Sequence, residues 1–245
     1  MTMHQRASGI SVFFPAFNDA NIIGSMVKQA SALLPTLTDN YEVIVINDGS
    51  TDSTEEVVAE IARAIPCVRL VSHQQNQGYG AALRSGFQHA SKELVFYTDG
   101  DGQYDVRDLS SLVPLMTTDC DVVNGYKLNR ADPSHRVILG SVYNRLARFL
   151  FRLPTRDVDC DFRLIRRSAF ERIKLRSSSG VICVEMIYKL HSAGCVFAET
   201  PVHHYERPFG KSQFFTLRRV ARTLFDLITL WIELVVLKRN RSSQL

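Results

Sequence analysis

The sequence predicts an α/β fold with a mostly parallel central sheet flanked by helices. Over residues 10–90, a short apolar run, a polar loop and a helical pattern follow one another three times. A fourth apolar run, at 94–98, stops abruptly at Asp99 and Asp101. Alternating strands and helices favour parallel strands joined by right-handed crossovers. The loops after the four strands should therefore share one edge of the sheet, where such sheets bind ligands.

The first half of the chain supplies the elements of this repeat. A buried strand is expected at 10–14, followed by a helix over 20–34 that Asn18 or Asp19 caps and Pro35 ends. Further strands are expected at 41–46, 68–71 and 94–98, where the residues are apolar and β-prone. Helices should fill the intervals at 53–64 and from the glycine-containing loop 76–80 to about Ala90.

The second half is less regular. A short strand is expected at 121–125 and an amphipathic helix at 137–151. An acidic loop, 156–161, leads into a strand at 162–164, and a helix over 181–193 carries Glu185 in its first turns. Residues 195–205 should be extended, and a basic loop at 206–212 precedes one long helical pattern at 214–237.

Composition narrows the class of protein. The 245 residues are 45% hydrophobic and 22% charged, an ordinary composition for a globular protein, and the formal net charge of +4 is mildly basic. The first half of the chain contains no stripe of Lys and Arg with interleaved aromatics, so it does not suggest a nucleic-acid partner. Five scattered cysteines without a C-x-x-C pair argue against disulfides or zinc and favour a reducing compartment. Residues 1–9 lack a secretory signal, and no apolar run reaches the roughly 20 residues of a membrane span.

The strongest chemical signal is the convergence of polar loops on one crevice. Carboxylate oxygens suit Mg²⁺, so Asp99 and Asp101 predict a metal site, although a solvated Asp-Gly turn explains this pair equally well on its own. No loop matches G-x-x-x-x-G-K-[ST], and none matches G-x-G-x-x-G after the first strand, which excludes a P-loop protein and an ordinary dinucleotide-binding domain. The other loops at this edge carry Asp19, Asp48, Asn76, Gly78 and Gly80.

Six short motifs occur in a fixed order along the chain, and their combination is far more specific than any one of them. They are Pro15-Ala16-Phe17-Asn18-Asp19, Asn47-Asp48-Gly49-Ser50-Thr51-Asp52, Asn76-Gln77-Gly78-Tyr79-Gly80, Asp99-Gly100-Asp101-Gly102-Gln103, Asp159-Cys160-Asp161-Phe162-Arg163 and Arg207-Pro208-Phe209-Gly210-Lys211-Ser212. Together they resemble the signatures of the family 2 glycosyltransferases, which have the GT-A nucleotide-diphospho-sugar transferase fold. The resemblance is closest to the polyprenyl-phosphate glycosyltransferases, the relatives of dolichol-phosphate mannose synthase. Two positions depart from the pattern: Asp19 replaces the usual Glu, and Asn47 replaces the first Asp of its segment.

The resemblance implies inverting transfer of a sugar from a UDP- or GDP-sugar, assisted by Mg²⁺ or Mn²⁺ on Asp101 and Asp99. The base and ribose would contact Pro15, Ala16, Phe17, Asn18, Asp19, Asp48 and Gly49, and Asn76, Gly78 and Gly80 would bring the backbone close to the nucleotide. Gln103 would contact the acceptor or the sugar, and Asp159, Asp161 and Glu185 are candidates for binding sugar hydroxyls or for acting as a base. Arg207 and Lys211, and less strongly Arg130, would clamp phosphates.

Each of these roles has an ordinary structural alternative. Asp48 precedes a predicted helix and has the chemistry of a cap. Gly78 and Gly80 suit a tight turn with positive φ. Arg207 and Lys211 are also compatible with ordinary surface charge. A hydroxyl acceptor would require a base, whereas a lipid phosphate is already anionic near neutral pH and would not. The catalytic base is therefore left unassigned.

The resemblance also implies a polyprenyl (undecaprenyl or dolichyl) phosphate acceptor and a cytoplasmic enzyme, peripheral on the cytoplasmic face of the membrane, in cell-envelope glycan synthesis. Residues 1–212 are expected to form the catalytic domain, and 213–245 a membrane-interface or dimerisation helix with a basic tail. Packing of this helix on the catalytic domain is the alternative, and a homo-oligomer or a membrane-protein partner is possible. The competing functions are a GT-A enzyme with a soluble or glycan acceptor and a non-catalytic nucleotide-sugar-binding protein.

Overall fold

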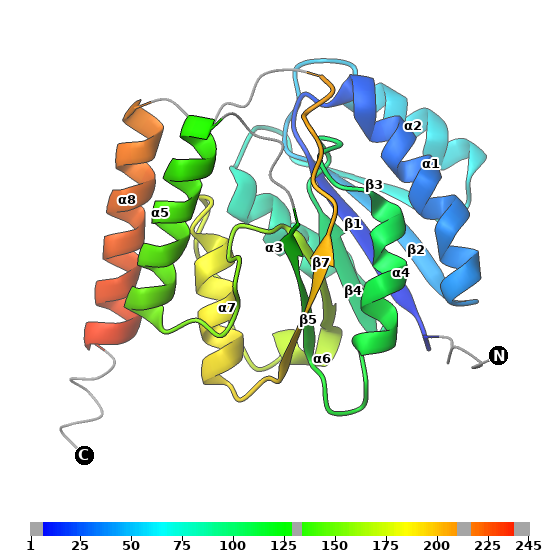
Figure 1. Ribbon diagram of the computed structural model, residues 1–245. Coiled ribbons are helices and arrows are strands. Elements are labelled where there is room, and N and C mark those ends of the chain that lie inside the picture. Colours follow the sequence, from blue (N-terminus) through cyan, green and yellow to red (C-terminus); the bar gives the residue numbers. More distant parts are fainter. Residues whose placement is uncertain (1–6, 129–133, 210–216, 238–245) are drawn as a thin grey trace.

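The computed structural model (Figure 1) describes residues 7–128, 134–209 and 217–237, with no side chains described at 134–136 and 217–219. This part of the chain contains one seven-stranded sheet of order β3-β2-β1-β4-β6-β5-β7. Strand β6 is antiparallel to both of its neighbours, and the other described pairs are parallel. The strands are β1 Ile10–Ala16, β2 Tyr41–Asn47, β3 Val68–Ser72, β4 Leu94–Thr98, β5 Val122–Lys127, β6 Phe162–Arg166 and β7 Phe197–Val202.

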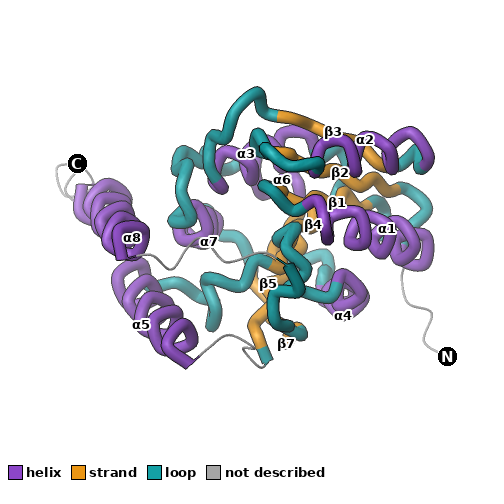
Figure 2. The backbone as a smooth tube through the Cα atoms, turned by 90° about the horizontal axis from the view of Figure 1, so that it is seen from above, coloured by secondary structure: helices purple, strands orange, loops and turns teal. Residues whose placement is uncertain are grey.

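Helices cover both faces of the sheet. They are α1 Ala20–Leu37, α2 Thr54–Ala64, α3 Tyr79–His89, α4 Leu109–Leu112, α5 Ser134–Phe151, α6 Arg167–Phe170, α7 Ile182–Ser192 and α8 Leu217–Trp231, which continues as a π-helical turn at Ile232–Val236. Short 3₁₀ turns, Val106–Asp108 and Val113–Leu115, flank α4. Helices α1, α2 and α4 pack on one face and α3, α6 and α7 on the other, so the domain has three layers (Figures 1 and 2).

The alternation of side chains along β1 divides the core into these two halves. Val12 and Phe14 point to the α1 side, whereas Phe13 points to the α3 side, and all three are completely buried. The ring of Phe13 lies so close to α3 that a Cβ on Gly86 would come within 2.3 Å of it. The glycine in this helix therefore serves close packing of the helix on the sheet.

Helices α5 and α8 lie side by side beyond α7 (Figures 1 and 2). Leu227 and Leu230 of α8 are buried in a third apolar cluster with side chains of α5 and α7. The indole of Trp231 donates to the Leu150 carbonyl at 3.0 Å. One side of α8 therefore packs on its own chain, as the packing alternative expected, and a membrane-interface or dimerisation role for its other side stays a prediction. The division of the chain at residue 212 stays a prediction.

The expected repeat of strands and helices is confirmed, and the differences have local causes. Helix α1 passes through Pro35 and ends at Leu37, because a proline removes only its own N–H and the last turn is closed by Thr38 N–H to the Leu34 carbonyl. The short helices around 106–115 and 167–170 were not expected, since single turns carry too few residues to show helical periodicity. All five cysteines are free. Within the described ranges, no helix combines the length and apolarity needed to cross a membrane.

The centre of the sheet contains a buried arginine. Arg163 on β6 has no exposed surface, and its guanidinium donates to Asn124 Oδ1 of β5 at 2.5 Å. It also donates to Asp161 Oδ1 at 2.9 Å, to the hydroxyl of Tyr97 on β4 and to the Val158 carbonyl. A buried charge is tolerated only when it is paired and hydrogen-bonded, and Arg163 meets this condition by linking three adjacent strands.

A buried carboxylate on β2 links this strand to its two neighbours, β1 and β3. Glu42 on β2 accepts hydrogen bonds from the hydroxyl of Ser11 at 2.7 Å, from the Ser91 N–H at 2.7 Å and from Arg69 at 2.9 Å. Burial raises the pKa of Glu42, but these hydrogen bonds outweigh burial and hold the pKa below its ordinary value. Folding therefore favours the ionised form of Glu42.

Replacing the buried arginine should be costly. In Arg163→Met, the carboxylate of Asp161 and the amide of Asn124 lose a buried partner, so we expect the free energy of unfolding to fall by about 3–5 kcal/mol. The matched control is Arg167→Met, which removes an exposed arginine just beyond β6 and should change stability by less than about 0.5 kcal/mol. Urea unfolding followed by circular dichroism measures both variants, and equal effects would contradict the role of Arg163.

The contribution of Glu42 should depend on pH. A lowered pKa in the folded state stabilises folding above the ordinary value of 4.5 and loses this effect as the pH falls through the folded-state pKa. Wild type should exceed Glu42→Gln by about 2 kcal/mol at neutral pH, and the difference should shrink steadily below pH 4.5. Denaturant unfolding across this pH range tests it, with exposed Glu60→Gln as control; a pH-independent difference would refute it.

Candidate active site

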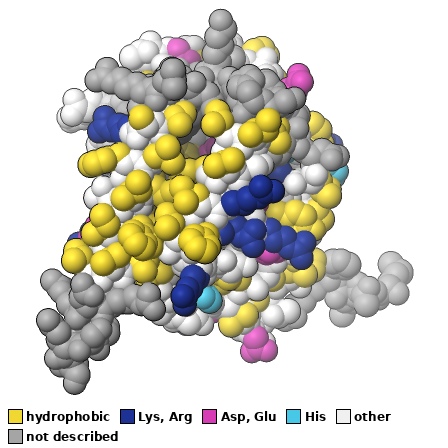
Figure 3. All heavy atoms as spheres, turned by 60° about the vertical axis from the view of Figure 1, so that its left-hand side comes forward, with side chains coloured by type: hydrophobic (Ala, Val, Ile, Leu, Met, Phe, Trp, Pro, Cys, Tyr) yellow, Lys and Arg dark blue, Asp and Glu magenta, His cyan; other side chains and the backbone are white. Residues whose placement is uncertain are grey.

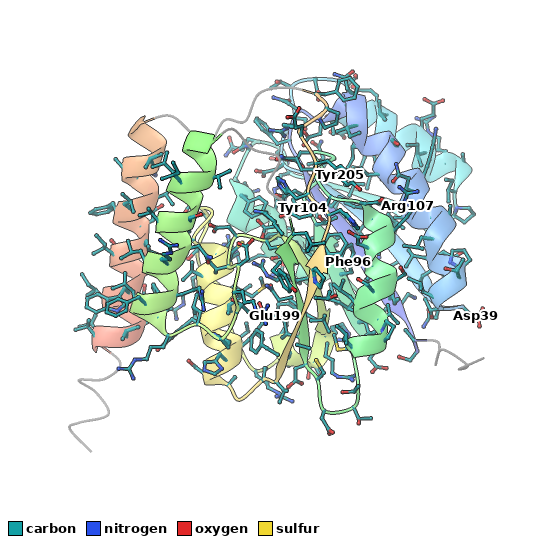
Figure 4. All side chains as sticks on the ribbon, in the orientation of Figure 1. Asp39, Phe96, Tyr104, Arg107, Glu199 and Tyr205 are labelled. Carbon is teal, nitrogen blue, oxygen red and sulfur yellow. The ribbon has the colours of Figure 1, made fainter. Side chains whose placement is uncertain are left out.

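Polar residues from six elements meet at the edge formed by the carboxyl ends of the parallel strands. Loops after β1, β2 and β4 supply Asp19, Asp48 and Asp99 with Asp101. Strand β5 ends at Lys127. Because β6 is antiparallel, it begins at this edge, directly after Asp161. The segment after β7 returns to the same place, where Tyr205 N–H donates to the Gln103 carbonyl at 2.8 Å; Tyr205 and Tyr104 are labelled in Figure 4.

Asp99, Asp101 and Asp161 form an acidic cluster at this edge. Burial, followed by the charges of Asp161 and Asp101, raises the pKa of Asp99 well above its ordinary value. Burial also raises the pKa of Asp101, although Arg207 opposes the shift. The hydroxyl of Tyr79, the first residue of α3, donates to Asp99 Oδ1 at 2.7 Å. Each carboxylate is thus destabilised by the others, an arrangement that a bound cation would relieve.

The cluster is suited to a divalent cation that is completed by substrate. Among the described residues, no group of three or more His, Cys, Asp and Glu side chains forms a ready metal cage. Mg²⁺ is usually held by one or two carboxylates together with substrate phosphates, and Mn²⁺ also prefers oxygen ligands. Asp101 and Asp99 fit this requirement, so the expectation for this pair stands as a proposal.

Two cations flank the acidic cluster. Arg207 reaches Asp19 Oδ1 at 3.3 Å and Asp101 Oδ2 at 3.7 Å. Its buried Nε has no hydrogen-bond partner among the described residues, so the guanidinium is only partly satisfied. Burial raises the pKa of Asp19 to about 6, while the Phe17 N–H and Arg207 oppose the shift. Lys127 donates to the Asp159 carbonyl at 2.8 Å. Its positive charge partly opposes the rise that burial causes in the pKa values of Asp99 and Asp101.

Sequence reasoning missed Lys127. Its signal was a cation two residues after the strand expected at 121–125; in the structure Lys127 is the last residue of β5, whereas Asp99 is the first residue beyond β4. Lys211 and Arg130, which were expected to bind phosphates, lie outside the described residues. The structure thus places Arg207 and Lys127 beside the acidic cluster.

Asp161 and Asp159 sit differently. Asp161 accepts from Arg163, from the thiol of Cys183 at 3.0 Å and from the Tyr97 hydroxyl at 3.3 Å. Its carboxylate is therefore fixed from beneath by the sheet. Asp159 is half-buried, and its backbone carbonyl rather than its carboxylate receives Lys127. Both residues lie at this edge of the sheet, and their expected roles in binding sugar hydroxyls or acting as a base stay predictions.

The loop after β1 is joined to the loop after β2. Asn18 adopts φ 58° and accepts from Thr51 N–H at 2.8 Å. Asp19 makes no side-chain cap to α1; its carboxylate accepts instead from Phe17 N–H at 3.0 Å. Asn47, where the family pattern has Asp, is completely buried, and its amide donates to Glu55 at 2.9 Å. This departure from the pattern serves the internal structure of the loop.

Asp48 is used to hold the next loop. Its buried carboxylate accepts from Gln77 N–H and Gly78 N–H, both at 2.9 Å, and lies 2.6 Å from His73 Nδ1. The alternative that Asp48 caps α2 is wrong, because its hydrogen-bond partners are in the loop before α3. Contact with a base or ribose stays a proposal for this residue.

The glycines at the site bring backbones together. A Cβ on Gly49 would lie 2.5 Å from the Asn76 nitrogen, and one on Gly80 would lie 2.4 Å from the Ser177 carbonyl oxygen. Gly78 has φ 92°, as the turn alternative predicted. The loop 75–80 is therefore held between the loop after β2 and the segment 177–178. No residue other than glycine fits at Gly49 or Gly80 unless the neighbouring backbone moves.

Glu185 belongs to this support as well. It is buried on α7 and accepts from Arg176 N–H at 3.0 Å, Ser177 N–H at 2.8 Å and Lys189 at 2.5 Å. Burial raises its pKa, but the hydrogen bonds from Lys189 and Ser177 hold it below the ordinary value. A carboxylate that is ionised and fully engaged is a poor proton acceptor, so the geometry disfavours Glu185 as a base.

Gln103 joins the loop after β4 to the segment after β7. Its amide donates to the Tyr205 carbonyl at 3.2 Å, complementing the reverse bond from Tyr205 N–H. Beneath it, the ring of Tyr104 packs on Phe162 at 5.6 Å between centroids. Gln103 thereby holds the segment that brings Arg207 over the acidic cluster. Its predicted contact with acceptor or sugar stays a prediction.

Solved structures share this fold. Glucosyl-3-phosphoglycerate synthase from Mycobacterium tuberculosis with Mn²⁺, UDP and glucosyl-3-phosphoglycerate matches with a TM-score of 0.71 and 21% identity, over 93% of this chain and 80% of that chain. The same enzyme with Mn²⁺ and UDP-glucose gives 0.69 and 20%, over 92% and 79%. A structure described as a mycobacterial protein gives 0.72 and 20%, over 93% and 74%.

At this level of identity, the structural matches establish the GT-A fold. The family follows from the sequence model described as glycosyl transferase family 2, which matches residues 11–174 and so covers more than half of the chain. This match includes the acidic cluster and the loops after β1, β2, β3 and β4. The chain therefore belongs to glycosyltransferase family 2.

Proposed function

We propose that this glycosyltransferase moves a sugar from a nucleoside-diphosphate sugar to an anionic phosphate acceptor, with Mn²⁺ or Mg²⁺ as cofactor. The observation that carries the proposal is the acidic cluster, flanked by Arg207 and Lys127 at the carboxyl edge of the sheet. The similar M. tuberculosis structures, which contain Mn²⁺ with UDP or UDP-glucose, support this choice of donor and metal.

The reaction is a single displacement. An acceptor oxygen forms a bond to the anomeric carbon as the bond from that carbon to the diphosphate oxygen breaks, so the configuration inverts and the electron pair leaves with the nucleoside diphosphate. A divalent cation on Asp101 and Asp99 would supply charge stabilisation for the departing diphosphate. Arg207, placed 3.7 Å from Asp101, would add a guanidinium to the same region.

The acceptor side favours a group that is already ionised. Asp161 is engaged with Arg163 and Cys183, and Glu185 with Lys189 and two backbone N–H groups. Neither carboxylate is arranged to remove a proton. A phosphate oxygen needs no strong base near neutral pH, and Lys127 would attract it electrostatically. This reasoning supports a phosphate acceptor over a neutral hydroxyl.

A lipid phosphate is the acceptor that the surface of α5 and α8 favours. Large apolar side chains on these helices are well exposed, including Phe149 at 81% and Phe225 at 69%. Figure 3 shows hydrophobic side chains gathered over this pair of helices. The members of this apolar face are Ile138, Leu139, Val142, Phe149, Leu224, Phe225, Ile228 and Ile232. An exposed patch of this kind marks a binding surface, and nearby exposed Arg145, Arg148 and Arg222 suit anionic headgroups.

We therefore propose a peripheral enzyme that transfers sugar to polyprenyl phosphate at the cytoplasmic face of a membrane. A soluble phosphorylated acceptor is the second candidate, favoured by the similar structures that contain phosphoglyceric acid or glucosyl-3-phosphoglycerate. Lys127 would attract the phosphate of either acceptor, but the attacking groups differ: the lipid phosphate would itself attack the sugar, whereas phosphoglyceric acid also offers a hydroxyl, whose attack would require loss of a proton. The two acceptors also differ in whether the apolar face of α5 and α8 is needed.

Transfer should depend on the metal-binding aspartate. Asp101→Asn is expected to lower sugar transfer at least ~100-fold, because the diphosphate loses its stabilising cation. Mn²⁺ binding in the presence of UDP, followed by electron paramagnetic resonance, should weaken in parallel. Asp105→Asn is the matched control, since Asp105 pairs with Arg107 away from the cluster. Full activity of Asp101→Asn would refute the assignment.

The acceptor is identified in the same assay. Wild type receives labelled UDP-sugars and then GDP-sugars, with either polyprenyl phosphate in detergent or 3-phosphoglycerate, and products are separated by organic extraction. Label in the organic phase supports the lipid acceptor, and label confined to the aqueous product with 3-phosphoglycerate supports the soluble one. Absence of transfer and of diphosphate release with every donor would contradict the proposed reaction.

The apolar face should bind membranes. Phe149→Ser combined with Phe225→Ser should weaken binding to vesicles of phosphatidylcholine and phosphatidylglycerol at least ~10-fold, because each phenyl ring would bury its area in lipid. Val196→Ser is the control: Val196 is 53% exposed and precedes β7. Vesicle flotation measures both. Undiminished binding of the double variant, or no wild-type binding, would remove the membrane from the proposal.

A further inference from the structure

A row of hydrogen-bonded side chains lies behind the loop before α3. His73 Nδ1 is 2.6 Å from Asp48 Oδ1, and His73 Nε2 is 2.8 Å from Ser85 Oγ. The side chains of His73 and Asp48 are only 9% and 5% exposed. The three residues follow β3, follow β2 and lie on α3, respectively. The row therefore joins three separate elements beneath the nucleotide side of the proposed site.

The chemistry of the partners sets the hydrogen-bond directions. An ionised carboxylate only accepts, so Nδ1–H of His73 donates to Asp48. In the neutral ring, Nε2 then accepts from the hydroxyl of Ser85. Both ring nitrogens of His73 are thus used within the protein. Neither is directed to a substrate, so any effect of His73 on catalysis acts through Asp48 or Ser85.

Asp48 passes this constraint to the backbone of the loop. Its two oxygens accept from Gln77 N–H and Gly78 N–H, each at 2.9 Å. Gly78 is the N-cap residue of α3 and provides no side chain to cap it. The start of α3 is therefore positioned by Asp48 from the neighbouring loop. The next residue, Tyr79, donates to Asp99 Oδ1 at 2.7 Å.

We infer that His73 is a positioning residue for the nucleotide-sugar site. By orienting Asp48, it sets the backbone at Gln77 and Gly78 and thereby places Tyr79 against Asp99. The kinetic consequence of this inference rests on the proposed function, whereas its structural consequence does not. Loss of His73 frees Asp48 to rotate, loosens the loop and misplaces a carboxylate of the acidic cluster.

The test compares His73→Ala with His73→Asn. The amide nitrogen of Asn lies close to the position of His Nδ1, so His73→Asn keeps the donor to Asp48 and loses only the contact with Ser85. We expect His73→Ala to lower kcat/KM for the nucleotide-sugar about tenfold or more, and His73→Asn to stay within about threefold of wild type. His89→Ala is the matched control, since His89 is an exposed histidine at the end of α3.

Hydrogen exchange gives a readout that needs no activity. In His73→Ala, the backbone amides of Gln77 and Gly78 should exchange faster, while those of β2 keep wild-type protection; His73→Asn should restore the protection. If wild type transfers no sugar, the proposed function fails and the exchange result alone decides the inference. Unchanged exchange in His73→Ala, or failure of His73→Asn to restore either property, would overturn it.

Discussion

The buried guanidinium of Arg163 is the interaction on which the site depends most. It lies in the middle of the sheet and bonds to side chains of β4 and β5 while holding Asp161 at the edge. Three carboxylates close together repel one another, and their charges become more costly away from water. A fixed cation under Asp161, with Arg207 and Lys127 at the sides, allows the acidic cluster to exist before any metal or substrate arrives.

A second constraint is that the loops of the site support one another through their backbones. Asp48 holds the loop before α3, which packs on Gly49 and on the segment that Glu185 holds from α7. Several residues that resemble ligand contacts are thus engaged with the protein itself. Such a frame positions the few groups that would touch substrate, because a reacting group misplaced by a small distance loses much of its effect.

Helices α5 and α8 add a different property to this frame. One side of α8 completes a buried cluster with α5 and α7, while the other side exposes large apolar residues. The same helix pair is thus both a structural part of the domain and a candidate docking surface. On a membrane-binding surface, charge and apolar area act together: anionic headgroups attract arginine side chains, and phenyl rings bury their area among the acyl chains. The acceptor proposed for the acidic cluster and the surface proposed for α5 and α8 are therefore chemically consistent.

The succession of strands and helices along the chain, the shared edge and the position of Asp99 and Asp101 at that edge could be predicted from the sequence, because hydrophobic periodicity and abrupt polar stops are local signals. The partners of Asp48, Asn47 and Glu185 could not, since each depends on a backbone amide or side chain brought near by a separate loop or helix turn. Lys127 acquired its place only when β5 was ordered in the sheet, and His73 only when Asp48 and Ser85 met across it. The sequence alone determined which residues are charged and which could serve as metal ligands. The tertiary structure decided which of these residues form their hydrogen bonds within the protein, because burial and pairing depend on contacts between distant segments.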